Sequence, residues 1–211
     1  AIVRKGLPLG SFFGYVSEGV NPETGDLMYK DLNNNNIFDP GDRTIIGNAQ
    51  PDFVFGLTNN FSWKGFDLDI FIQGSYGNDI FNATRIDLEG MFDSKNQSVA
   101  VLNRWTPDNR ITDMPRAIGN GNVKNVLNST RFIEDGSYIR IKSLTLAYNF
   151  SGPWLAKAGL SALRLYTTGQ NLFTITGYSG YDPEVNAFGR SATELGIDYG
   201  YTLSLHDALP I

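Results

Sequence analysis

The sequence predicts an all-β protein with an antiparallel sheet that spans a membrane. Two observations favour this fold class. Segments 53–63 and 66–76 alternate apolar and polar side chains on either side of the two-residue turn Lys64-Gly65, and short connections alternate with long ones along the chain. Alternation with period two gives each strand one oily face and one polar face. Strands of about ten residues with this pattern can cross a bilayer, with the oily face toward lipid and the polar face toward a water-filled lumen.

The composition supports strands and excludes several classes of protein. The 211 residues include 23 glycines and no cysteine, and they are 13% aromatic and 41% hydrophobic. This content excludes bulk disorder, disulfides and cysteine-based sites. No apolar run approaches the roughly 18 residues of a membrane-spanning helix. The net charge of −5 and the lack of a Lys/Arg cluster argue against a nucleic-acid partner.

Five segments are predicted as strands because aromatic and β-branched residues alternate with polar ones between turn-forming residues. In the hairpin, Phe53, Leu57 and Phe61 share one face of the first strand, and Phe71 is the one exception to alternation in the second. A sixth segment, 199–205, alternates weakly. The five segments are, in chain order, residues 9–16, 53–63, 66–76, 138–150 and 163–173.

Segment 138–150 changes phase in its middle. Ile139 and Ile141 have one parity, whereas Leu144 and Leu146 have the other. A β-bulge near residues 140–143 would bring all four side chains to one face. Alternatively, the charged residues of this stretch lie above the hydrocarbon layer, where charge is tolerated.

Three connections are long, at residues 17–51, 77–137 and 174–198, whereas the turn 64–65 and the stretch 151–162 are short. Long loops without regular structure are uncommon in compact soluble domains. Outer-membrane barrels place short turns in the periplasm and long loops outside the cell. We therefore expect the three long connections to be extracellular.

Seven motifs, taken in order, resemble the C-terminal part of SusC/RagA-type TonB-dependent outer-membrane transporters. Together they extend over nearly the whole chain. They are GLPLGSFFGY (6–15), YKDLNNNNIFDPGDRTIIG (29–47), NAQPDF (48–53), FIQGSYGNDI (71–80), RWTPD (104–108), IEDGSYIRIK (133–142) and LYTTGQNLF (165–173).

The resemblance implies a barrel of about 22 strands with a plug in its lumen, of which residues 1–202 supply the last five or six strands. It implies import of oligosaccharides or peptides across the outer membrane, energy from the TonB complex, and a SusD-like surface lipoprotein as partner. Residues 203–211 lack alternation and a closing aromatic residue, so we expect a non-native or disordered tail. The alternative is a secreted β-sandwich binding module stabilised by calcium.

Residues 31–42 have the spacing of a calcium-binding loop and look similar to an EF-hand or dockerin-type loop. Calcium takes six to eight oxygen ligands, and the low charge of this set predicts weak, structural binding. The alternative is an Asx-rich turn that closes on its own backbone without metal. The candidate ligands at loop positions 1, 3, 5, 9 and 12 are Asp31, Asn33, Asn35, Asp39 and Asp42, and the backbone carbonyl of Ile37 occupies position 7.

Three aromatic residues in the long connections are candidates for ligand contact. The rings of Trp105, Tyr178 and Tyr181 could stack on a sugar or a peptide, and the alternative is packing within the loops. No catalytic residue is predicted, and the protein is not expected to be an enzyme. Asp67 and Asp69 share one face of a strand, where solvated wall residues are the simpler interpretation.

Overall fold

The computed structural model describes residues 1–92, 96–119, 123–185, 187, 191 and 193–200. The chain divides into two compact units. Unit 2 consists of residues 51–78 and 136–177, and unit 1 gathers the remaining segments. Each of the two units has its own hydrogen-bonded sheets.

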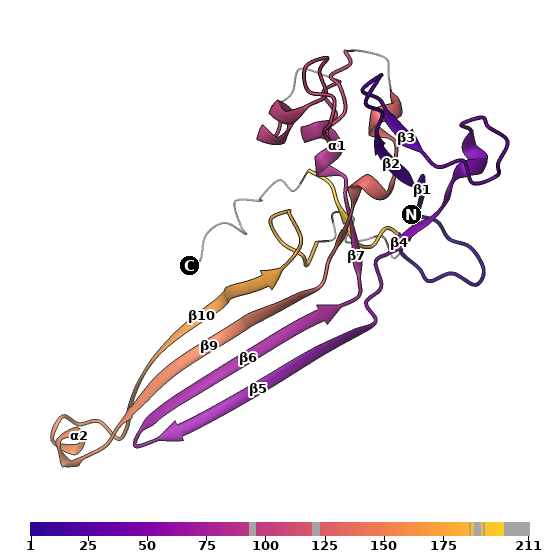
Figure 1. Ribbon diagram of the computed structural model, residues 1–211. Coiled ribbons are helices and arrows are strands. Elements are labelled where there is room, and N and C mark those ends of the chain that lie inside the picture. The colour runs from indigo at the N-terminus through magenta and orange to yellow at the C-terminus, as the bar shows by residue number, and fades with distance from the viewer. Residues whose placement is uncertain (93–95, 120–122, 186, 188–190, 192, 201–211) are drawn as a thin grey trace. The chain divides into compact units, whose positions relative to one another are not determined.

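Unit 2 is a four-stranded antiparallel sheet in the order β10-β9-β6-β5 (Figure 1). The sequence predicted the bounds of three strands correctly, and the fourth extends three residues further than expected, to Thr176. The strands are β5 (Phe53–Trp63), β6 (Phe66–Tyr76), β9 (Tyr138–Phe150) and β10 (Leu163–Thr176).

The two short connections lie at the same end of this sheet. Lys64 and Gly65 join β5 to β6 with φ values of 46° and 89°. A two-residue hairpin of type I′ requires positive φ at both central residues, and its twist matches that of the strands. Helix α2 (Pro153–Lys157) lies in the connection from β9 to β10. The long segments leave from the other end, where β5 and β9 begin.

A bulge in β9 confirms the prediction for residues 140–143. Phe71 of β6 pairs with Ser143, and the next residue, Ile72, pairs with Ile141, so Lys142 is the extra residue. One inserted residue exchanges the two faces of a strand beyond that point. The isoleucines at 139 and 141 therefore share a face with the leucines at 144 and 146.

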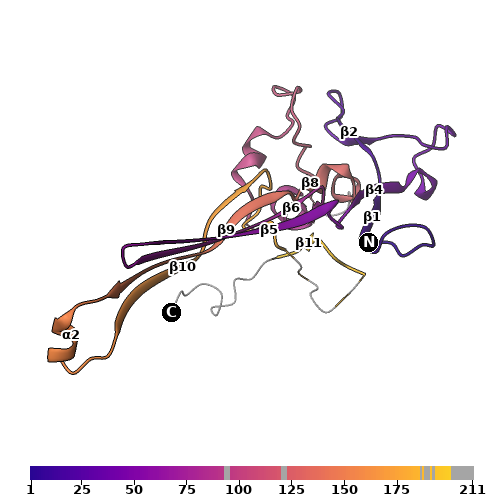
Figure 2. The same ribbon diagram turned by 90° about the horizontal axis from the view of Figure 1, so that it is seen from below.

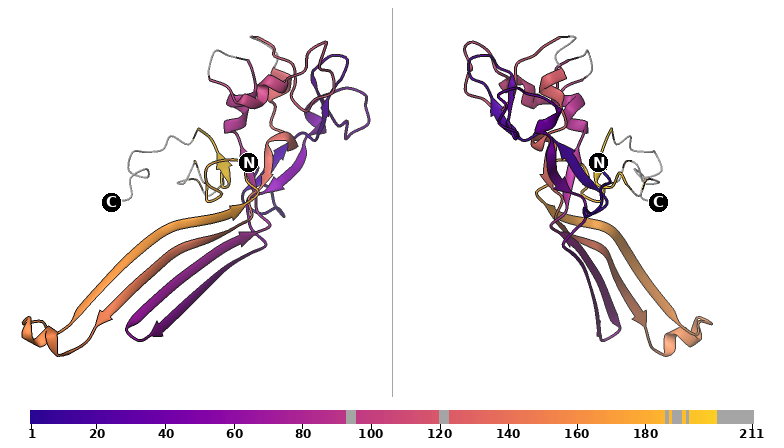
Figure 3. Two further views of the ribbon diagram at one scale, coloured as in Figure 1. Left: turned by 60° about the vertical axis from the view of Figure 1, so that its left-hand side comes forward. Right: turned by 90° about the vertical axis from the view of Figure 1, so that its right-hand side faces the viewer.

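The sheet is a single twisted layer (Figures 2 and 3), and its register gives it one apolar face. Leu57, Leu146 and Phe173 on this face remain 53%, 43% and 59% exposed. In the described part of the chain, every cluster of buried hydrophobic residues belongs to unit 1. A β-sandwich would bury these side chains between two layers. The exposed face instead fits a strand wall that meets lipid. The register places on it Phe53, Phe55, Leu57, Phe61, Trp63, Phe66, Leu68, Ile70, Ile72, Ile139, Ile141, Leu144, Leu146, Tyr148, Leu165, Phe173 and Ile175.

The described residues of unit 1 form seven short strands, and the sequence predicted only the first of them. The first predicted strand, 9–16, is shorter than expected, and it pairs with β4 instead of joining the four-stranded sheet. The strands are β1 (Ser11–Gly14) with β4 (Thr44–Asn48), β2 (Ser17–Val20) with β3 (Leu27–Tyr29), and β7 (Asp79–Asn82) with β8 (Ile133–Asp135) and β11 (Ile197–Asp198).

The long connections are therefore not structureless. Phe12, Phe81, Ala83 and Phe132 form a buried cluster that joins segments from three parts of the sequence. No helix in the described ranges is long and apolar enough to cross a membrane. The helical elements of unit 1 are α1 (Thr84–Glu89) and the 3-10 turns η1 (Pro40–Asp42), η2 (Val99–Asn103), η3 (Val123–Val126) and η4 (Thr130–Phe132).

Two predictions concern residues that are largely outside the described ones. The weak sixth strand, 199–205, has only its first two residues described, and the expected tail, 203–211, lies wholly outside.

Candidate functional site

The polar face of the four-stranded sheet is connected by hydrogen bonds between side chains on neighbouring strands. Asp67 of β6 accepts hydrogen bonds from the Ser62 hydroxyl (2.7 Å) and the Asn149 amide (2.6 Å). The hydroxyls of Thr145 and Thr168 lie 2.9 Å apart. The hydrogen bonds from Ser62 and Asn149 hold Asp67 on the polar face of the sheet, where the alternation places it.

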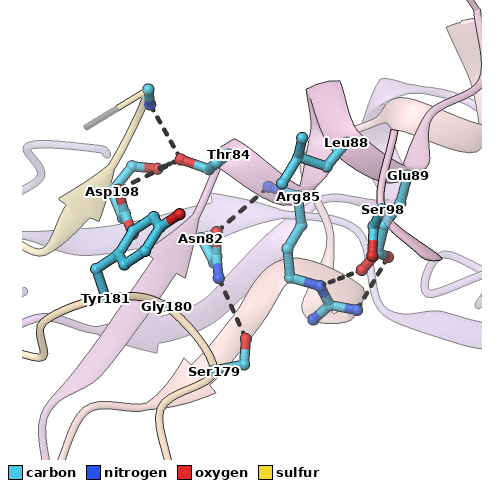
Figure 4. A pocket seen from close by; sticks show the side chains of 11 residues that line it. Asn82, Thr84, Arg85, Leu88, Glu89, Ser98, Ser179, Gly180, Tyr181 and Asp198 are labelled. Atoms are coloured by element: carbon cyan, nitrogen blue, oxygen red, sulfur yellow. Dashed lines mark hydrogen bonds and ion pairs between the residues drawn. The ribbon is translucent and has the colours of Figure 1, made fainter. Parts of the chain in front are cut away.

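Unit 1 contains a pocket of about 710 Å³, which falls within the usual size range of small-molecule sites. Helix α1 and the end of β7 contribute to the lining, together with Ser98 and the segments 179–181 and 198–200 (Figure 4). Most of the lining side chains are polar. The lining residues are Asn82, Thr84, Arg85, Leu88, Glu89, Ser98, Ser179, Gly180, Tyr181, Asp198 and Gly200.

The charged groups beside the pocket neutralise one another. The Arg85 guanidinium contacts both carboxylate oxygens of Glu89 at 2.8 and 3.1 Å, and it also contacts Glu134 at 3.0 Å. Arg131 reaches Glu89 at 3.1 Å. Burial lowers the pKa of Arg85, but the two carboxylates outweigh burial and raise it. This network joins α1 to η4 and β8.

The opposite side of the pocket is fixed by Asp198. The buried hydroxyl of Tyr178 donates to the Asp198 carboxylate, and the Thr84 hydroxyl lies 3.3 Å from it. Burial and the neighbouring carboxylate raise the pKa of Tyr178, which therefore stays a neutral hydrogen-bond donor. The backbone N–H of Gly200 donates to the Thr84 hydroxyl at 3.0 Å.

The three predicted ligand-contact residues have different environments. Trp105 is half-buried beside Gly25, and its indole N–H donates to the Pro22 carbonyl at 3.0 Å. Tyr178 is buried. Tyr181 is 87% exposed and lines the pocket. Ligand contact stays a prediction for all three residues.

The sequence did not indicate the polar lining of the pocket. Asn82, Ser179 and Asp198 come from distant segments and belong to no motif with a known chemistry. The only local signal was the i,i+4 spacing of Arg85 and Glu89, which is typical of an ion pair on a helix.

The predicted calcium loop closes on its own backbone. The Asp31 carboxylate accepts backbone N–H groups of Asn35 (3.3 Å) and Asn36 (2.7 Å). Asp42 accepts those of Leu32 and Asp39, each at 3.0 Å. These bonds to backbone lower the pKa of Asp42. Among the described residues, no group of three or more His, Cys, Asp or Glu side chains is arranged to hold a metal ion.

Known receptors align with most of this chain, although no family model matches it. The chain is 37% identical to TonB-dependent receptor P3 of Formosa agariphila over 94% of this chain and 21% of that protein. Identity to TonB-dependent receptor P26 of the same organism is 33%, over 79% of this chain and 17% of that protein. Identity to the TonB-dependent receptor SusC of Bacteroides thetaiotaomicron is 28%, over 82% of this chain and 17% of that protein. The chain thus spans about a fifth of the length of these relatives.

Solved structures give the same relationship. The RagAB peptide transporter superposes with a TM-score of 0.71 at 27% identity, over 82% of this chain and 20% of that chain. The RagAB peptide importer in its 'closed-closed' state gives a TM-score of 0.69 at 28% identity, over 82% of this chain and 20% of that chain. These relatives are named as receptors and transporters, which agrees with the prediction that the protein is not an enzyme. The chain therefore belongs to the SusC-type TonB-dependent receptors, the family that its ordered motifs indicated, and it corresponds to about a fifth of their length.

Proposed function

We propose that the protein imports nutrients across the outer membrane and that unit 2 is a segment of its transmembrane barrel wall. The observation that carries this proposal is the apolar face of the four-stranded sheet, where Leu57 and Leu146 remain about half exposed. Soluble monomers rarely leave an apolar surface of this extent uncovered. The opposite face, with its hydrogen-bonded polar side chains, suits a water-filled lumen.

The proposed partners follow from the relationship to SusC and RagAB. A SusD-like surface lipoprotein would bind on the extracellular side, and the TonB complex would supply energy through parts of the protein outside this chain. The imported molecule would be an oligosaccharide or a peptide. The segments of unit 1 would be extracellular, because they leave the sheet from the end opposite the short turns.

The membrane assignment can be tested with two adjacent residues of β5 in the natural full-length protein. Leu57 lies on the apolar face and Thr58 on the polar face, and both are exposed. We expect Leu57→Arg to destabilise the folded barrel by about 2–4 kcal/mol, because the charge would enter hydrocarbon. Thr58→Arg is the matched control and should assemble normally. Assembly is measured as the folded fraction in isolated outer membranes, and equal assembly of the two variants would contradict the proposal.

The import function can be tested by growth. A strain that lacks the full-length gene is compared with a complemented strain on oligosaccharides or on peptides as the carbon source. We expect a growth defect on one of the two classes that disappears on complementation. Equal growth of both strains on every substrate would contradict import.

Calcium binding by residues 31–42 remains a prediction with a direct test. The loop has three carboxylates within its twelve residues, those of Asp31, Asp39 and Asp42. We expect weak heat signals on calcium titration that disappear in a variant with Asp31→Ala and Asp39→Ala. Unchanged signals in that variant would leave the metal-free turn as the explanation.

A further inference from the structure

We infer that the connection from β9 to β10 is an anchor at the surface of an anionic phospholipid leaflet. In this assignment the ring of Trp154, in α2, lies against the lipid, and Lys64 and Lys157 pair with lipid phosphates. The inference rests on the proposed membrane wall and extends it beyond the strands, to the two short connections. It depends on a continuous row of rings, on the place of β9 within the sheet and on the charge of the connections.

The row of rings begins on the apolar face of the sheet and ends on α2. Phe66 of β6 and Tyr148 of β9 are register partners on that face, and their ring centroids lie 4.5 Å apart. The ring of Phe150, the last residue of β9, lies 4.7 Å from that of Tyr148. The Trp154 ring then meets Phe150 edge-on, with the centroids 6.0 Å apart. Trp154 therefore extends the apolar face past the end of the strands.

Trp154 stays 46% exposed although the next residue of α2 is covered. Leu155 is only 6% exposed, so the helix packs against its surroundings at one residue and leaves the other uncovered. The backbone N–H of Ala158 donates to the Trp154 carbonyl at 3.0 Å, and that of Leu160 donates to the Leu155 carbonyl at 2.9 Å. These bonds fix the short helix. An indole combines a large apolar surface with one N–H donor, and such side chains gather where a membrane meets water.

The position of β9 decides what covers this row of rings. β9 lies between β6 and β10, so the row belongs to the interior of the four-stranded sheet. The strands that complete the proposed barrel would pair at the outer edges of β5 and β10, beside this face and not over it. The other strands of the barrel therefore leave the row uncovered, and in a membrane lipid is its neighbour.

The charge of the two short connections favours an anionic lipid. The connections lie at the same end of the sheet (Figure 1), and residues 64–65 and 151–162 contain two lysines but no Asp or Glu. Their charge is thus opposite to the net charge of −5 of the chain. Both lysines, Lys64 and Lys157, are exposed, and the Lys64 ammonium lies 4.8 Å from the ring centroid of Trp63. Basic side chains close to a membrane surface attract anionic headgroups.

Contact with lipid is tested by fluorescence quenching in the purified full-length protein, reconstituted in vesicles of phosphatidylcholine and phosphatidylglycerol. The probe is a phospholipid with bromine on its acyl chains, because bromine quenches an indole only on contact. The signal of Trp154 is the fluorescence of the natural protein minus that of Trp154→Phe, which keeps an aromatic ring. We expect brominated lipid to remove most of this signal. The matched control is Trp105→Phe, which reports an indole of unit 1 that donates to the Pro22 carbonyl, and its signal should persist.

The role of the lysines is tested in the same protein by urea unfolding. Phosphatidylglycerol should raise the unfolding midpoint above its value in phosphatidylcholine alone. The variant with Lys64→Gln and Lys157→Gln should lose most of this rise. The matched control, with Lys5→Gln and Lys30→Gln, removes two exposed lysines of unit 1 and should retain the rise.

The inference is overturned if the Trp154 signal is the same in brominated and ordinary lipid, or if both double variants keep the full rise with phosphatidylglycerol. Failure of the proposed function would look different. If the Leu57 and Thr58 variants assemble unequally while Trp154 is not quenched, the membrane wall stands and only the anchor at α2 is refuted. If those two variants assemble equally, the membrane wall is refuted as well.

Discussion

At the scale of single residues, the ion-pair network beside the pocket is the most consequential feature of unit 1. Glu89 forms ion pairs with Arg85 and Arg131, and the side chains of Glu89 and Arg131 are each only 10% exposed. Removing one partner of such a network leaves cations in a poorly hydrated place. The network therefore holds α1 in position against η4 and β8.

We predict that Glu89→Ala lowers the free energy of local unfolding of α1 by about 3 kcal/mol, because two guanidinium groups lose their shared carboxylate. Hydrogen exchange of the α1 amides in the full-length protein measures this change. Glu18→Ala removes an exposed carboxylate and is the control. Equal protection of α1 in both variants would show that the network does not stabilise the helix.

We predict that the contribution of Glu134 to the stability of the folded protein depends on pH. Burial raises the pKa of this carboxyl, but hydrogen bonds from Ser179 and the charge of Arg85 outweigh burial and lower it below the ordinary value of 4.5. A lowered folded pKa means that the stabilisation is complete above pH 4.5 and is lost as the pH falls through the folded value. The stability difference between the natural protein and Glu134→Gln should therefore shrink in acid, as thermal unfolding from pH 7 to pH 3 would measure. A constant difference would refute this role.

At the scale of elements, the bulge in β9 decides which of its residues lie on the apolar face of the sheet. We predict that deletion of Lys142 prevents normal assembly, because it moves Ile139 and Ile141 to the polar face and Arg140 to the apolar face. Lys142→Ala keeps the extra residue and should assemble normally. The folded fraction in outer membranes distinguishes the two variants, and normal assembly of the deletion would contradict the assigned register.

The turn between β5 and β6 provides a second prediction for an element. Gly65 has φ of 89°, and an added Cβ would meet the Asn149 carbonyl oxygen at 3.0 Å. We predict that Gly65→Ala destabilises the sheet by about 1–2 kcal/mol, because the left-handed conformation is unfavourable for a residue with a side chain. Gly119→Ala is the control, since a Cβ there meets nothing within 4 Å. Urea unfolding midpoints measure the effect, and equal midpoints would refute it.

The elements also show what could be predicted from the sequence. The bounds of β5, β6 and β9 could be predicted from the alternation of apolar and polar residues. This alternation is a local signal, because each of these strands has one apolar and one polar face. The strands of unit 1 other than β1 could not be predicted from alternation, because each is at most five residues long. Their cluster joins Phe12, Phe81 and Phe132, and no periodicity relates positions so far apart.

The same reasoning applies to the candidate site. Tyr181 could be singled out because an aromatic residue in a long connection is a candidate for ligand contact. The rest of the pocket could not be predicted, because Asn82, Ser179 and Asp198 meet only after three segments fold together. The calcium loop was predicted from local spacing, and the carboxylates of Asp31 and Asp42 accept backbone N–H groups within the same loop.

At the scale of the whole molecule, the account depends on what covers the apolar face of unit 2. A soluble protein would need a second layer of side chains over Leu57, Leu146 and Phe173, and the four-stranded sheet has none among the residues of unit 2. In the proposed barrel, lipid would supply that layer. Hydrogen bonds to neighbours on both sides pair the backbone groups of β6 and β9. In the proposed barrel, further strands would pair with the outer edges of β5 and β10, because a membrane-spanning sheet has no open edge.

The most direct test is spin-label accessibility at two adjacent residues of β9 in the full-length protein, reconstituted in lipid bilayers. Nitroxide labels are attached to Leu146→Cys and Thr145→Cys in a background without other cysteines. We predict that the label at 146 collides mainly with oxygen, which concentrates in lipid, and that the label at 145 collides mainly with a water-soluble nickel chelate. Equal access of both labels to the chelate would contradict the membrane-wall assignment.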